Sequence, residues 1–435
     1  MESANWFLRL YGTLLYVLLL ASTNGASPLV GKVDNELVDA IRQVRNYKEK
    51  DKCMALFDFS GSLAYGSLDS AILYYQIDQM KFGFTPTEFR EAFYFSPEHT
   101  KMCISTNHFA FDQNGVAIPT KNLFRALQMD YAFLYEQMYG DKKKSLREVK
   151  NDAKYERFKL LMLYYHQQFD RKVQNEKACA SLKKYQTSRW WMHLSMHSVK
   201  EILFKVARYE AGEIKQVVGT VTIEGQSARV QYTFDFKINT EALDLIKVLN
   251  AENIHTVIMT EAEKTMMSYY NDQVIHAKSV YGTQYTEYDP RFPSQTSSIP
   301  SAAYHLTSSQ TVTPEMSSPT FLGYVKPGTI NPVAYGKDEI IKQIMEMRGS
   351  KPCIVFADSA SDYSLVRYMT RGVIVVQTSR NSGNGELYEQ VMSDHTEVKD
   401  HHVRVFKQRV DGSRNWVSSA IHAYEARGST SLDWQ

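Results

Sequence analysis

Four polar side chains in this sequence stand where short apolar runs end or a helical pattern begins, and their chemistry suits a phosphate ester. Asp58 closes the run CMALFD, Thr260 closes TVIMT and Asp358 closes PCIVFAD, while Lys337 follows Gly336 at the start of a helical pattern. A carboxylate can attack phosphorus as a nucleophile, and a lysine with a divalent cation can neutralise the phosphoryl oxygens. These residue types are compatible with metal-assisted phosphoryl chemistry.

The apolar runs that carry these groups are typical of buried parallel strands, and VIVVQ at 373–377 is a fourth run of the same kind. Helical spacing occurs at 34–47, 241–249, 261–270, 338–348 and 364–370. Alternating strands and helices predict an α/β fold with a Rossmann-like parallel sheet. Ligands of such sheets bind at the carboxyl ends of the strands, so we expect Asp58 and Asp358 to meet at one site.

The segment between the first two runs has a different character. From 68 to about 212 it is helical in pattern and rich in Tyr, Phe, Met and Lys. Residues 217–223 and 229–236 alternate like two strands around Gly225, which predicts a β-hairpin. Residues 289–332 are rich in Ser, Thr and Pro, and we expect loops there with little regular structure. No pattern predicts the fold after about Ser382.

Length and composition exclude several classes of protein. A chain of 435 residues corresponds to two or three domains. Hydrophobic residues at 43% and charged residues at 23% exclude a disordered chain, a collagen and a coiled-coil rod. The net charge is +2, which provides no strong field for nucleic acid, so we expect no nucleic-acid partner.

The N-terminus has the features of a secretory signal peptide. The apolar run TLLYVLLLA at 13–21 follows Arg9 and precedes small polar residues at 22–26. Its core is shorter than the roughly 20 residues that span a bilayer. We therefore expect residues 1–26 to be removed, and the mature chain to be secreted or to reside in the lumen of the secretory pathway without stable membrane insertion. An uncleaved signal anchor is the alternative.

Taken in order, four motifs resemble those of the haloacid dehalogenase-like (HAD) superfamily of phosphohydrolases: DFSGSL at 58–63, Thr260, Gly336-Lys337 and DSASD at 358–362. The resemblance covers about 50–65 and 240–380. The helical block lies where the family places a type 1 cap, and the residues around 241–260 and VYGT at 280–283 look like the phosphoserine-phosphatase branch. Secreted phosphorylcholine phosphatases are a plausible relative within that branch. The resemblance implies a HAD-like core over 27–66 and 240–435, with a mainly helical cap over 67–239 that ends near the hairpin.

The resemblance also implies a role for each motif residue. Asp58 would be the nucleophile and a Mg²⁺ ligand, and Lys337 would neutralise the phosphoryl charge and orient Asp58. The main chain of Ser60 and the carboxylate of Asp358 would coordinate the metal, and Asp362 would either coordinate it or accept hydrogen bonds from its ligands. Ser60, Gly61 and Thr260 would bind the phosphate. Together they predict a magnesium-dependent phosphomonoesterase that acts on a small phosphorylated metabolite through an aspartyl-phosphate.

Two residues depart from the family pattern. Ser60 stands where most phosphatases of this family carry a second Asp as the general acid and base, and a hydroxyl cannot do that proton transfer near neutral pH. Glu261 follows Thr260 where the branch usually has a small residue, and it adds negative charge near an anion site. The alternative is therefore a catalytically impaired binding or structural protein on the same scaffold. A third possibility is phosphoryl transfer to an acceptor other than water.

The four cysteines provide a separate geometric expectation. Cys53 lies five residues before Asp58, and Cys353 lies five before Asp358. If the two acids share a metal, their strands are neighbours in similar register, and the two cysteines lie about 5 Å apart across them. A disulfide and a reduced pair both fit this geometry. Cys103 and Cys179 could pair with each other, and four buried thiols are the alternative.

Two further groups have simple structural interpretations. His193 and His197 are four residues apart in a helical pattern, which can bind zinc, but no Glu or Cys completes an evident site. Trp190 and Trp191, with nearby tyrosines, could form an aromatic cage for a quaternary ammonium group. The simpler interpretations are two ordinary surface or core histidines and aromatic side chains of the core.

Overall fold

The computed structural model describes the parts of the chain that carry the predicted site. The described residues are 35–45, 53–92, 118–141, 143–175, 189–209, 215–234, 236–283, 285–288, 320–325, 335–369, 371–378, 387–391, 393, 403–410 and 416–417. The predicted signal peptide at 1–26 and the pair Cys103 and Cys179 lie outside them. No helix among these residues is long and apolar enough to cross a membrane.

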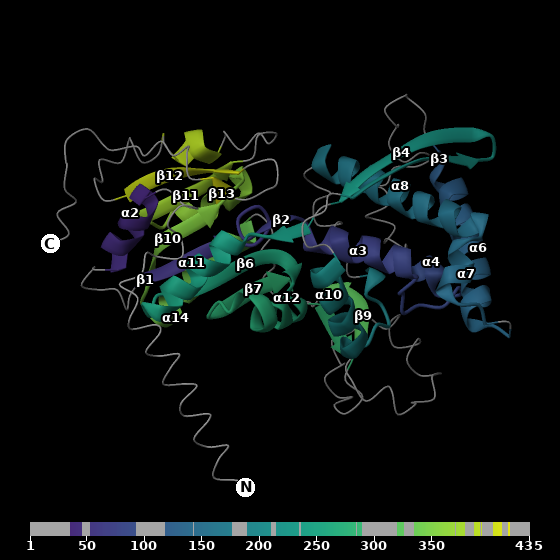
Figure 1. Ribbon diagram of the computed structural model, residues 1–435, viewed down its shortest axis with the longest axis horizontal. Coiled ribbons are helices and arrows are strands. Elements are labelled where there is room, and N and C mark those ends of the chain that lie inside the picture. The colour runs from purple at the N-terminus through teal and green to yellow at the C-terminus, as the bar shows by residue number, and fades with distance from the viewer. Residues whose placement is uncertain are drawn as a thin grey trace, which may run out of the picture. The chain divides into compact units, whose positions relative to one another are not determined.

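A seven-stranded sheet forms the centre of the α/β fold, with strands in the order β13-β12-β11-β10-β1-β6-β7 (Figure 1). The strands are β1 (Cys53–Asp58), β6 (His255–Glu263), β7 (Ser279–Thr283), β10 (Lys351–Ala357), β11 (Gly372–Thr378), β12 (Val403–Val410) and β13 (Trp416–Val417). Only the short β13 is antiparallel, and it pairs with β12. The predicted fold class is confirmed: a six-stranded parallel sheet is combined with helical regions.

The strand order places a topological switch at β1. From this strand the chain continues outward to β6 and β7 on one side, and later to β10, β11 and β12 on the other. Connections that leave in opposite directions open a crevice at the carboxyl ends of the central strands, where ligands of such sheets bind. All six residues of β1 and six of the seven in β10 are buried, as their apolar sequences predicted.

Five helices come from the segments that alternate with these strands. They are α2 (Asn35–Arg45), α11 (Thr240–Ala251), α12 (Lys264–Tyr270), α14 (Tyr335–Arg348) and α15 (Tyr363–Val366). The prediction was wrong at the start of α12, because residues 261–263 continue β6 instead of opening the helix. Glu263 caps α12 by accepting a hydrogen bond from the Met266 amide at 2.6 Å, and the Thr283 hydroxyl holds the Glu261 carbonyl at 2.7 Å. The side-chain cap therefore moves the helix start three residues later.

The segment between β1 and β6 is mainly helical. Its helices are α3 (Leu68–Gln79), α4 (Phe89–Ala92), α6 (Thr120–Tyr139), α7 (Leu146–Lys150), α8 (Ala153–Asn175) and α10 (Met196–Tyr209). Helices α6 and α8 pack together around a core rich in aromatic rings, in which Tyr131 stacks on Phe89 with ring centroids 4.8 Å apart.

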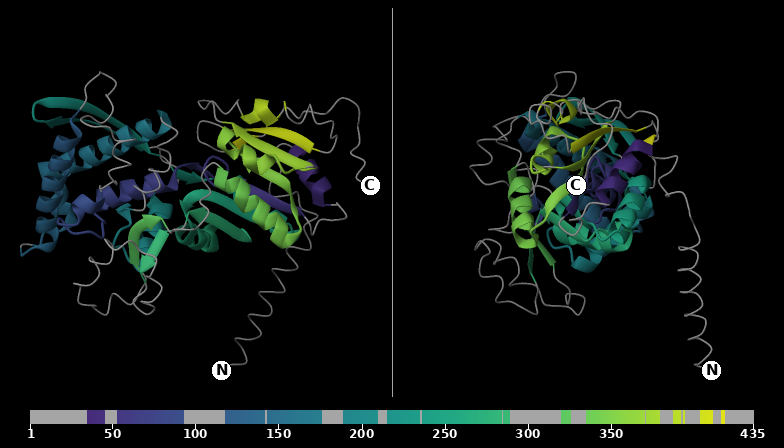
Figure 2. Two further views of the ribbon diagram at one scale, coloured as in Figure 1. Left: turned by 180° about the vertical axis from the view of Figure 1, so that it is seen from behind. Right: turned by 90° about the vertical axis from the view of Figure 1, so that its left-hand side faces the viewer.

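The predicted hairpin is confirmed as β3 (Lys215–Ile223) and β4 (Gln226–Phe234), whose buried face packs on α8 (Figure 1). From behind, it is the curved teal ribbon of Figure 2. Glu224 and Gly225 both have positive φ, +48° and +80°, as a two-residue hairpin turn requires. Val221, Val230 and Tyr232 lie on the buried face.

Two small ribbons differ from the sequence prediction. Residues 289–332 were expected to lack regular structure, but β9 (Thr320–Val325) lies within them and pairs antiparallel with β8 (Tyr285–Tyr288), so that expectation was wrong there. Strand β9 is short and its partner is remote in sequence, which leaves little local signal. The other ribbon pairs β2 (Ala64–Gly66) with β5 (Phe236–Ile238) and was not predicted.

Two compact units can be distinguished in the chain. One contains the described residues within Met1–Ala55, Asn239–Thr256 and Ser350–Gln435, and its core includes β10, β11 and β12. The other contains Leu56–Ile238 and Val257–Gly349 and includes all the helices from α3 to α10.

Candidate functional site

The end of β1 holds a buried ion pair. Asp58 is the last residue of this strand, and the Nζ atom of Lys337 donates a hydrogen bond to its Oδ1 atom at 2.9 Å. The side chains of Lys337 and Asp58 are only 4% and 8% exposed. Lys337 belongs to the first turn of α14 and is 279 positions away in sequence. Removing one partner of a buried pair leaves an uncompensated charge, so each residue holds the other in place.

Three carboxylates gather at the carboxyl ends of β1 and β10. Asp58, Asp358 and Asp362 each offer an oxygen atom, and these atoms lie within 4.8 Å of one another. Among the described residues, this is the group of acidic, His or Cys side chains whose spacing suits a metal ion. A divalent cation would reduce the repulsion among these three carboxylates. Hard oxygen donors of this type suit Mg²⁺.

Asp362 also orders the loop that follows β10. Its Oδ2 atom accepts hydrogen bonds from the amide of Asp358 at 3.4 Å, the amide of Ser359 at 3.3 Å and the hydroxyl of Ser359 at 3.0 Å. These bonds hold Asp358 in place directly after the strand. Asp362 therefore has a positioning role in addition to the carboxylate that it offers to a cation.

The loop after Asp58 is a tight turn that requires Gly61. The φ angle of Gly61 is +92°, and its amide donates to the Ala64 carbonyl at 2.6 Å. The amide of Phe59 donates to the Met259 carbonyl at 3.0 Å, which joins the end of β1 to β6. Ser60 is exposed at the turn. The roles predicted for the Ser60 main chain and for Gly61 remain predictions.

Thr260 lies within β6, which is the neighbour of β1 in the sheet, and is 1% exposed. Its Oγ1 atom accepts a hydrogen bond from the Ala262 amide at 3.0 Å. Because the oxygen is held as an acceptor, the hydroxyl proton can be donated elsewhere. This orientation suits the predicted hydrogen bond from Thr260 to a phosphoryl oxygen, which remains a prediction.

Sequence reasoning missed Ser62 as a candidate. Ser62 is 1% exposed, and its hydroxyl has no hydrogen-bond partner among the described residues. Buried hydroxyls are normally hydrogen-bonded, so this one can serve a bound ligand or water. The sequence signal that could have identified Ser62 is its position directly after Gly61, in the loop that follows the end of β1.

Three aromatic rings that pack beside the end of β1, next to Asp58, were also missed. Phe59 lies 6.2 Å from Phe236 and 6.4 Å from Tyr270 between ring centroids, and Phe236 lies 6.2 Å from Tyr270. Burial raises the pKa of Tyr270, which keeps its phenol neutral. These rings make an apolar support for the residue next to Asp58. They come from three separate segments, so no local motif could have identified them.

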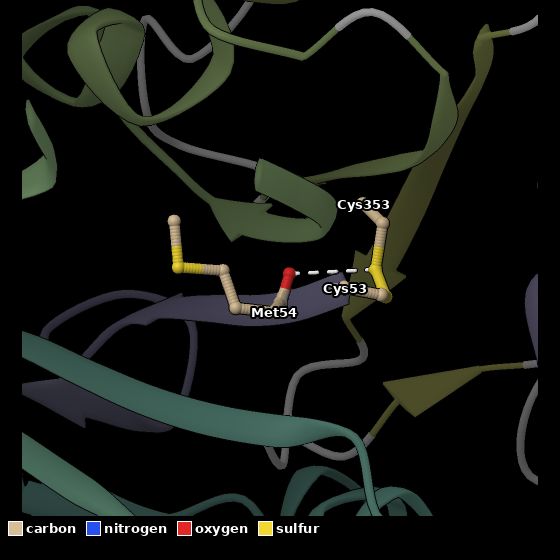
Figure 3. The surroundings of a disulfide bond; sticks show 3 residues. All are labelled: Cys53, Met54 and Cys353. Carbon is tan, nitrogen blue, oxygen red and sulfur yellow. Dashed lines mark hydrogen bonds between the residues drawn. A yellow bond between two sulfur atoms is a disulfide. The ribbon is translucent and has the colours of Figure 1, made fainter. Parts of the chain in front are cut away.

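The cysteine expectation is confirmed for one pair. Cys53 and Cys353 lie side by side with their sulfur atoms at bonding distance and their Cα atoms 5.4 Å apart, and Figure 3 shows the disulfide beside Met54. Cys103 and Cys179 lie outside the described residues.

The histidine pair and the tryptophan pair singled out in the sequence show no sign of a binding site among the described residues. The Nε2 atom of His193 faces the Oε1 atom of Glu88 at 3.7 Å. Trp190 and Trp191 are 3% and 2% exposed, and the Trp190 ring packs against His166 with centroids 5.4 Å apart. These tryptophans are core side chains, and their faces do not form an open cage.

Comparison with known proteins shows similarity at the level of fold. No family model matches the chain, and no curated protein matches it either. A conserved protein of unknown function from Anaerococcus prevotii DSM 20548 has a similar structure, with a TM-score of 0.66 at 16% identity over 90% of this chain and 96% of that one. This similarity supports the fold and, at that identity, the fold alone.

Two enzymes of known class match more weakly. A HAD family hydrolase from Salmonella enterica subsp. enterica serovar Typhi matches with a TM-score of 0.32 at 8% identity, over 74% of this chain and 62% of that one. A probable phosphoserine phosphatase from Vibrio cholerae matches with a TM-score of 0.28 at 10% identity, over 75% of this chain and 57% of that one. TM-scores this low carry no argument about this chain.

Proposed function

We propose that this protein is a magnesium-dependent phosphomonoesterase that acts on a small phosphorylated metabolite through an aspartyl-phosphate on Asp58. The observation that carries the proposal is the buried hydrogen bond of 2.9 Å from Lys337 to Asp58 at the carboxyl end of a central strand. A buried lysine beside a strand-end carboxylate provides a nucleophile and a positive charge for the phosphoryl group at one place.

The residues of the site fit the attack and the charge neutralisation of such a reaction. The Asp58 carboxylate attacks phosphorus, the bond from phosphorus to the ester oxygen breaks, and the leaving oxygen takes its proton from solvent water. Lys337 balances negative charge on the phosphoryl oxygens, and the Thr260 hydroxyl donates to one of them. Magnesium held by Asp58, Asp358 and Asp362 would supply further neutralisation of the phosphoryl charge. Water then cleaves the aspartyl-phosphate and releases phosphate.

A second function is favoured by Ser60 and Glu261. Ser60 cannot protonate a leaving alcohol near neutral pH, and Glu261 adds negative charge beside Thr260. A catalytically impaired binding or structural protein on this scaffold would bind phosphate or Mg²⁺ without turnover. Transfer to an acceptor other than water would instead show as turnover that rises when alcohols are added.

The experiment is an assay of phosphate release from phosphomonoesters, including phosphocholine and an aryl phosphate, with and without Mg²⁺. Asp58→Asn removes the nucleophile, and Asp78→Asn is the matched control, since Asp78 is also a buried partner of a lysine, Lys150. Magnesium-dependent turnover that is lost in Asp58→Asn and kept in Asp78→Asn supports the proposal. Equal rates in the wild type and in Asp58→Asn would overturn the hydrolase, and binding without turnover would favour the second function.

We also propose that the mature chain is secreted or resides in the lumen of the secretory pathway. The apolar run at 13–21 and the Cys53–Cys353 pair support this location, because disulfides persist in oxidising compartments. The proposed partner is the small phosphorylated substrate, with no nucleic acid and no stable membrane insertion after cleavage. N-terminal sequencing of the secreted chain would test the cleavage near residue 26.

A further inference from the structure

We propose that the Cys53–Cys353 pair is a redox control on cation binding: the disulfide locks the register of β1 against β10, and this register lets Asp58, Asp358 and Asp362 hold a divalent cation. The proposal rests on the metal site of the function proposed above. Nothing in that reaction uses the two cysteines, which belong to the same two neighbouring strands as the acids but lie at a distance from them.

Equal spacing on the two strands connects the disulfide to the site. Five residues separate Cys53 from Asp58, and five separate Cys353 from Asp358. At about 3.3 Å per residue, the cross-link lies roughly 16 Å from the carboxylates along each strand. Because side chains alternate between the faces of a strand and five is an odd number, Cys53 and Asp58 point to opposite faces of β1. The disulfide can therefore fix register without obstructing the site.

The site is sensitive to register because its ligands come from both strands. The three carboxylate oxygens lie within 4.8 Å of one another, and Mg²⁺ demands near-octahedral geometry at short distances. A slip of one residue would move Asp58 by about 3.3 Å relative to Asp358 and turn it to the other face of the sheet. Even a partial shift of this kind would take one ligand out of reach of a shared ion.

The backbone of Cys353 lies close to β11 on the side away from β1. Gly372 in β11 has a φ angle of +123°, and a Cβ atom built there would lie 1.9 Å from the carbonyl oxygen of Cys353, so only glycine fits at this position. The residue after Cys353, Ile354, pairs with Val373, so β10 is held in register with β11 from this point onward. The disulfide then fastens the first residue of β1 to this fixed position.

Both redox states of the pair fit the structure. The sulfur of Cys353 lies 3.4 Å from the carbonyl oxygen of Met54, as the dashed line in Figure 3 shows. In the disulfide this is only a contact, because the sulfur carries no hydrogen. After reduction the Cys353 thiol can donate a hydrogen bond to the Met54 carbonyl. This hydrogen bond partly compensates for the loss of the disulfide bond. Reduction is therefore expected to loosen the register without unfolding the sheet.

The chemical step is thiol–disulfide exchange with glutathione. A glutathione thiolate attacks one protein sulfur, the protein disulfide breaks and a mixed disulfide forms; a second glutathione then releases the other thiol. Two glutathione molecules become glutathione disulfide, and the protein gains two thiols, so electrons and protons balance. Oxidation by glutathione disulfide is the reverse.

The experiment measures Mg²⁺ binding in both redox states. The chain carries Cys103→Ser and Cys179→Ser, so that Cys53 and Cys353 are the only cysteines of the four. Calorimetric titration with Mg²⁺ is done on the oxidised form and on the form reduced with dithiothreitol, with circular dichroism to verify that both are folded. We expect the Kd for Mg²⁺ to rise about fivefold or more on reduction, the lower range of coupling between linked sites.

Linkage provides a second measurement that does not depend on turnover. If reduction weakens Mg²⁺ binding by a given factor, saturating Mg²⁺ must lower the equilibrium constant for reduction by glutathione by the same factor. In Asp358→Asn, which removes a proposed ligand, this shift should disappear. The double variant Cys53→Ser/Cys353→Ser cannot form the disulfide, so its Kd for Mg²⁺ should equal that of the reduced protein. If this double variant does not fold, the chemically reduced protein provides the same comparison.

The outcomes separate this inference from the proposed function. An equal Kd in the two redox states, with magnesium-dependent turnover intact, overturns the redox control and leaves the phosphatase standing. Absence of Mg²⁺ binding in both states overturns the control together with the metal site. A higher Kd after reduction, with the matching shift in the glutathione equilibrium, supports the proposal.

Discussion

Two buried aspartates in this chain, Asp58 at the end of β1 and Asp78 in α3, each accept a hydrogen bond from a lysine but differ in their remaining neighbours. Lys150 lies 2.6 Å from the Oδ2 atom of Asp78, and Lys159 lies 3.7 Å from its Oδ1 atom. The Tyr155 hydroxyl adds contacts of 2.8 Å to the Asp78 carbonyl and 3.2 Å to Oδ1. Two ammonium groups and a phenol therefore satisfy one carboxylate.

Asp58 has the opposite balance of charge. One lysine, Lys337, lies 2.9 Å from it, and two further carboxylates, Asp358 and Asp362, have oxygens within 4.8 Å. Like charges at this distance in a partly buried place repel strongly. The comparison teaches that the neighbours of a Lys–Asp pair distinguish the two cases: a second lysine surrounds Asp78, whereas two further carboxylates that could hold a cation surround Asp58.

The largest effect is expected from removing the lysine of the site. In Lys337→Met, turnover should fall about 10²–10³-fold, because one preorganised group that stabilises the developing charge is lost. Affinity for Mg²⁺ should rise at the same time, since the site becomes more negative. Steady-state kinetics and calorimetric titration measure the two changes, and Lys150→Met is the matched control with unchanged turnover. Unchanged turnover in Lys337→Met would mean that Lys337 has only a structural role, as Lys150 does.

Restoring the missing acid should produce a gain of about 10²-fold. Ser60→Asp provides a carboxylic group that can protonate a leaving alcohol, and Ser60 is exposed at its turn, so the larger side chain can be accommodated. The rate should increase for alkyl phosphates and change little for aryl phosphates, whose leaving groups do not need the proton. Ser60→Asn has the same shape without the acid. Equal rates in the two variants would mean that proton transfer at this position does not limit the reaction.

The structural pair should respond in stability and leave catalysis unchanged. In Lys150→Met, the free energy of unfolding should fall by about 1–3 kcal/mol, because Asp78 loses its shorter charged hydrogen bond and keeps only Lys159. Urea unfolding measures the change, and the kcat of the folded protein should equal that of the wild type. If turnover fell by more than the fraction of folded protein, the Lys150–Asp78 pair would also affect catalysis. The distinction between a structural pair at Asp78 and a catalytic pair at Asp58 would then be wrong.

The smallest effect concerns acid pH. Burial alone would raise the pKa of Asp78, but the hydrogen bond and charge of Lys150, with the charge of Lys159, outweigh it, so the pKa lies below the ordinary value of 3.8. A lowered pKa in the folded state means that Asp78 stabilises the fold above about pH 3.8 and loses this contribution as the pH falls through its folded pKa.

Urea unfolding of the wild type and Asp78→Asn at several pH values tests this sign. The difference in free energy of unfolding between them should be largest near pH 6 and should shrink as the pH falls below 3.8. A difference that grows toward acid pH would show that the lysines do not lower the pKa of Asp78.

The fold could be predicted where burial is continuous along the chain. Strands β1, β10 and β11 each contain a continuous apolar run because both faces of a parallel sheet are covered, and these runs were recognised directly. Strand β12 reads VRVFKQRV, in which charged residues interrupt the apolar ones, and its place beside β11 was not predicted. Its Gln408 is fully buried, which only the neighbouring strand explains.

The candidate site was partly predictable for a related reason. Acids that end apolar strands are visible in the sequence, so Asp58 and Asp358 could be placed at one edge of the sheet in advance. The orphan hydroxyl of Ser62 and the aromatic support formed by Phe236 and Tyr270 could not be, because their importance depends on what surrounds them.

The sequence by itself determined which chemical groups lie at the strand ends and in what order, because the apolar composition of each short run predicts that the run is a buried strand. Only the tertiary structure decided which groups meet. Lys337 and Lys150 look alike in sequence, yet one contacts an aspartate 279 positions away and the other an aspartate 72 positions away. Electrostatic energy depends on distance in space and on the surrounding charges, and local periodicity contains neither. The balance of charge that distinguishes a binding site from a structural pair therefore exists only in the folded chain.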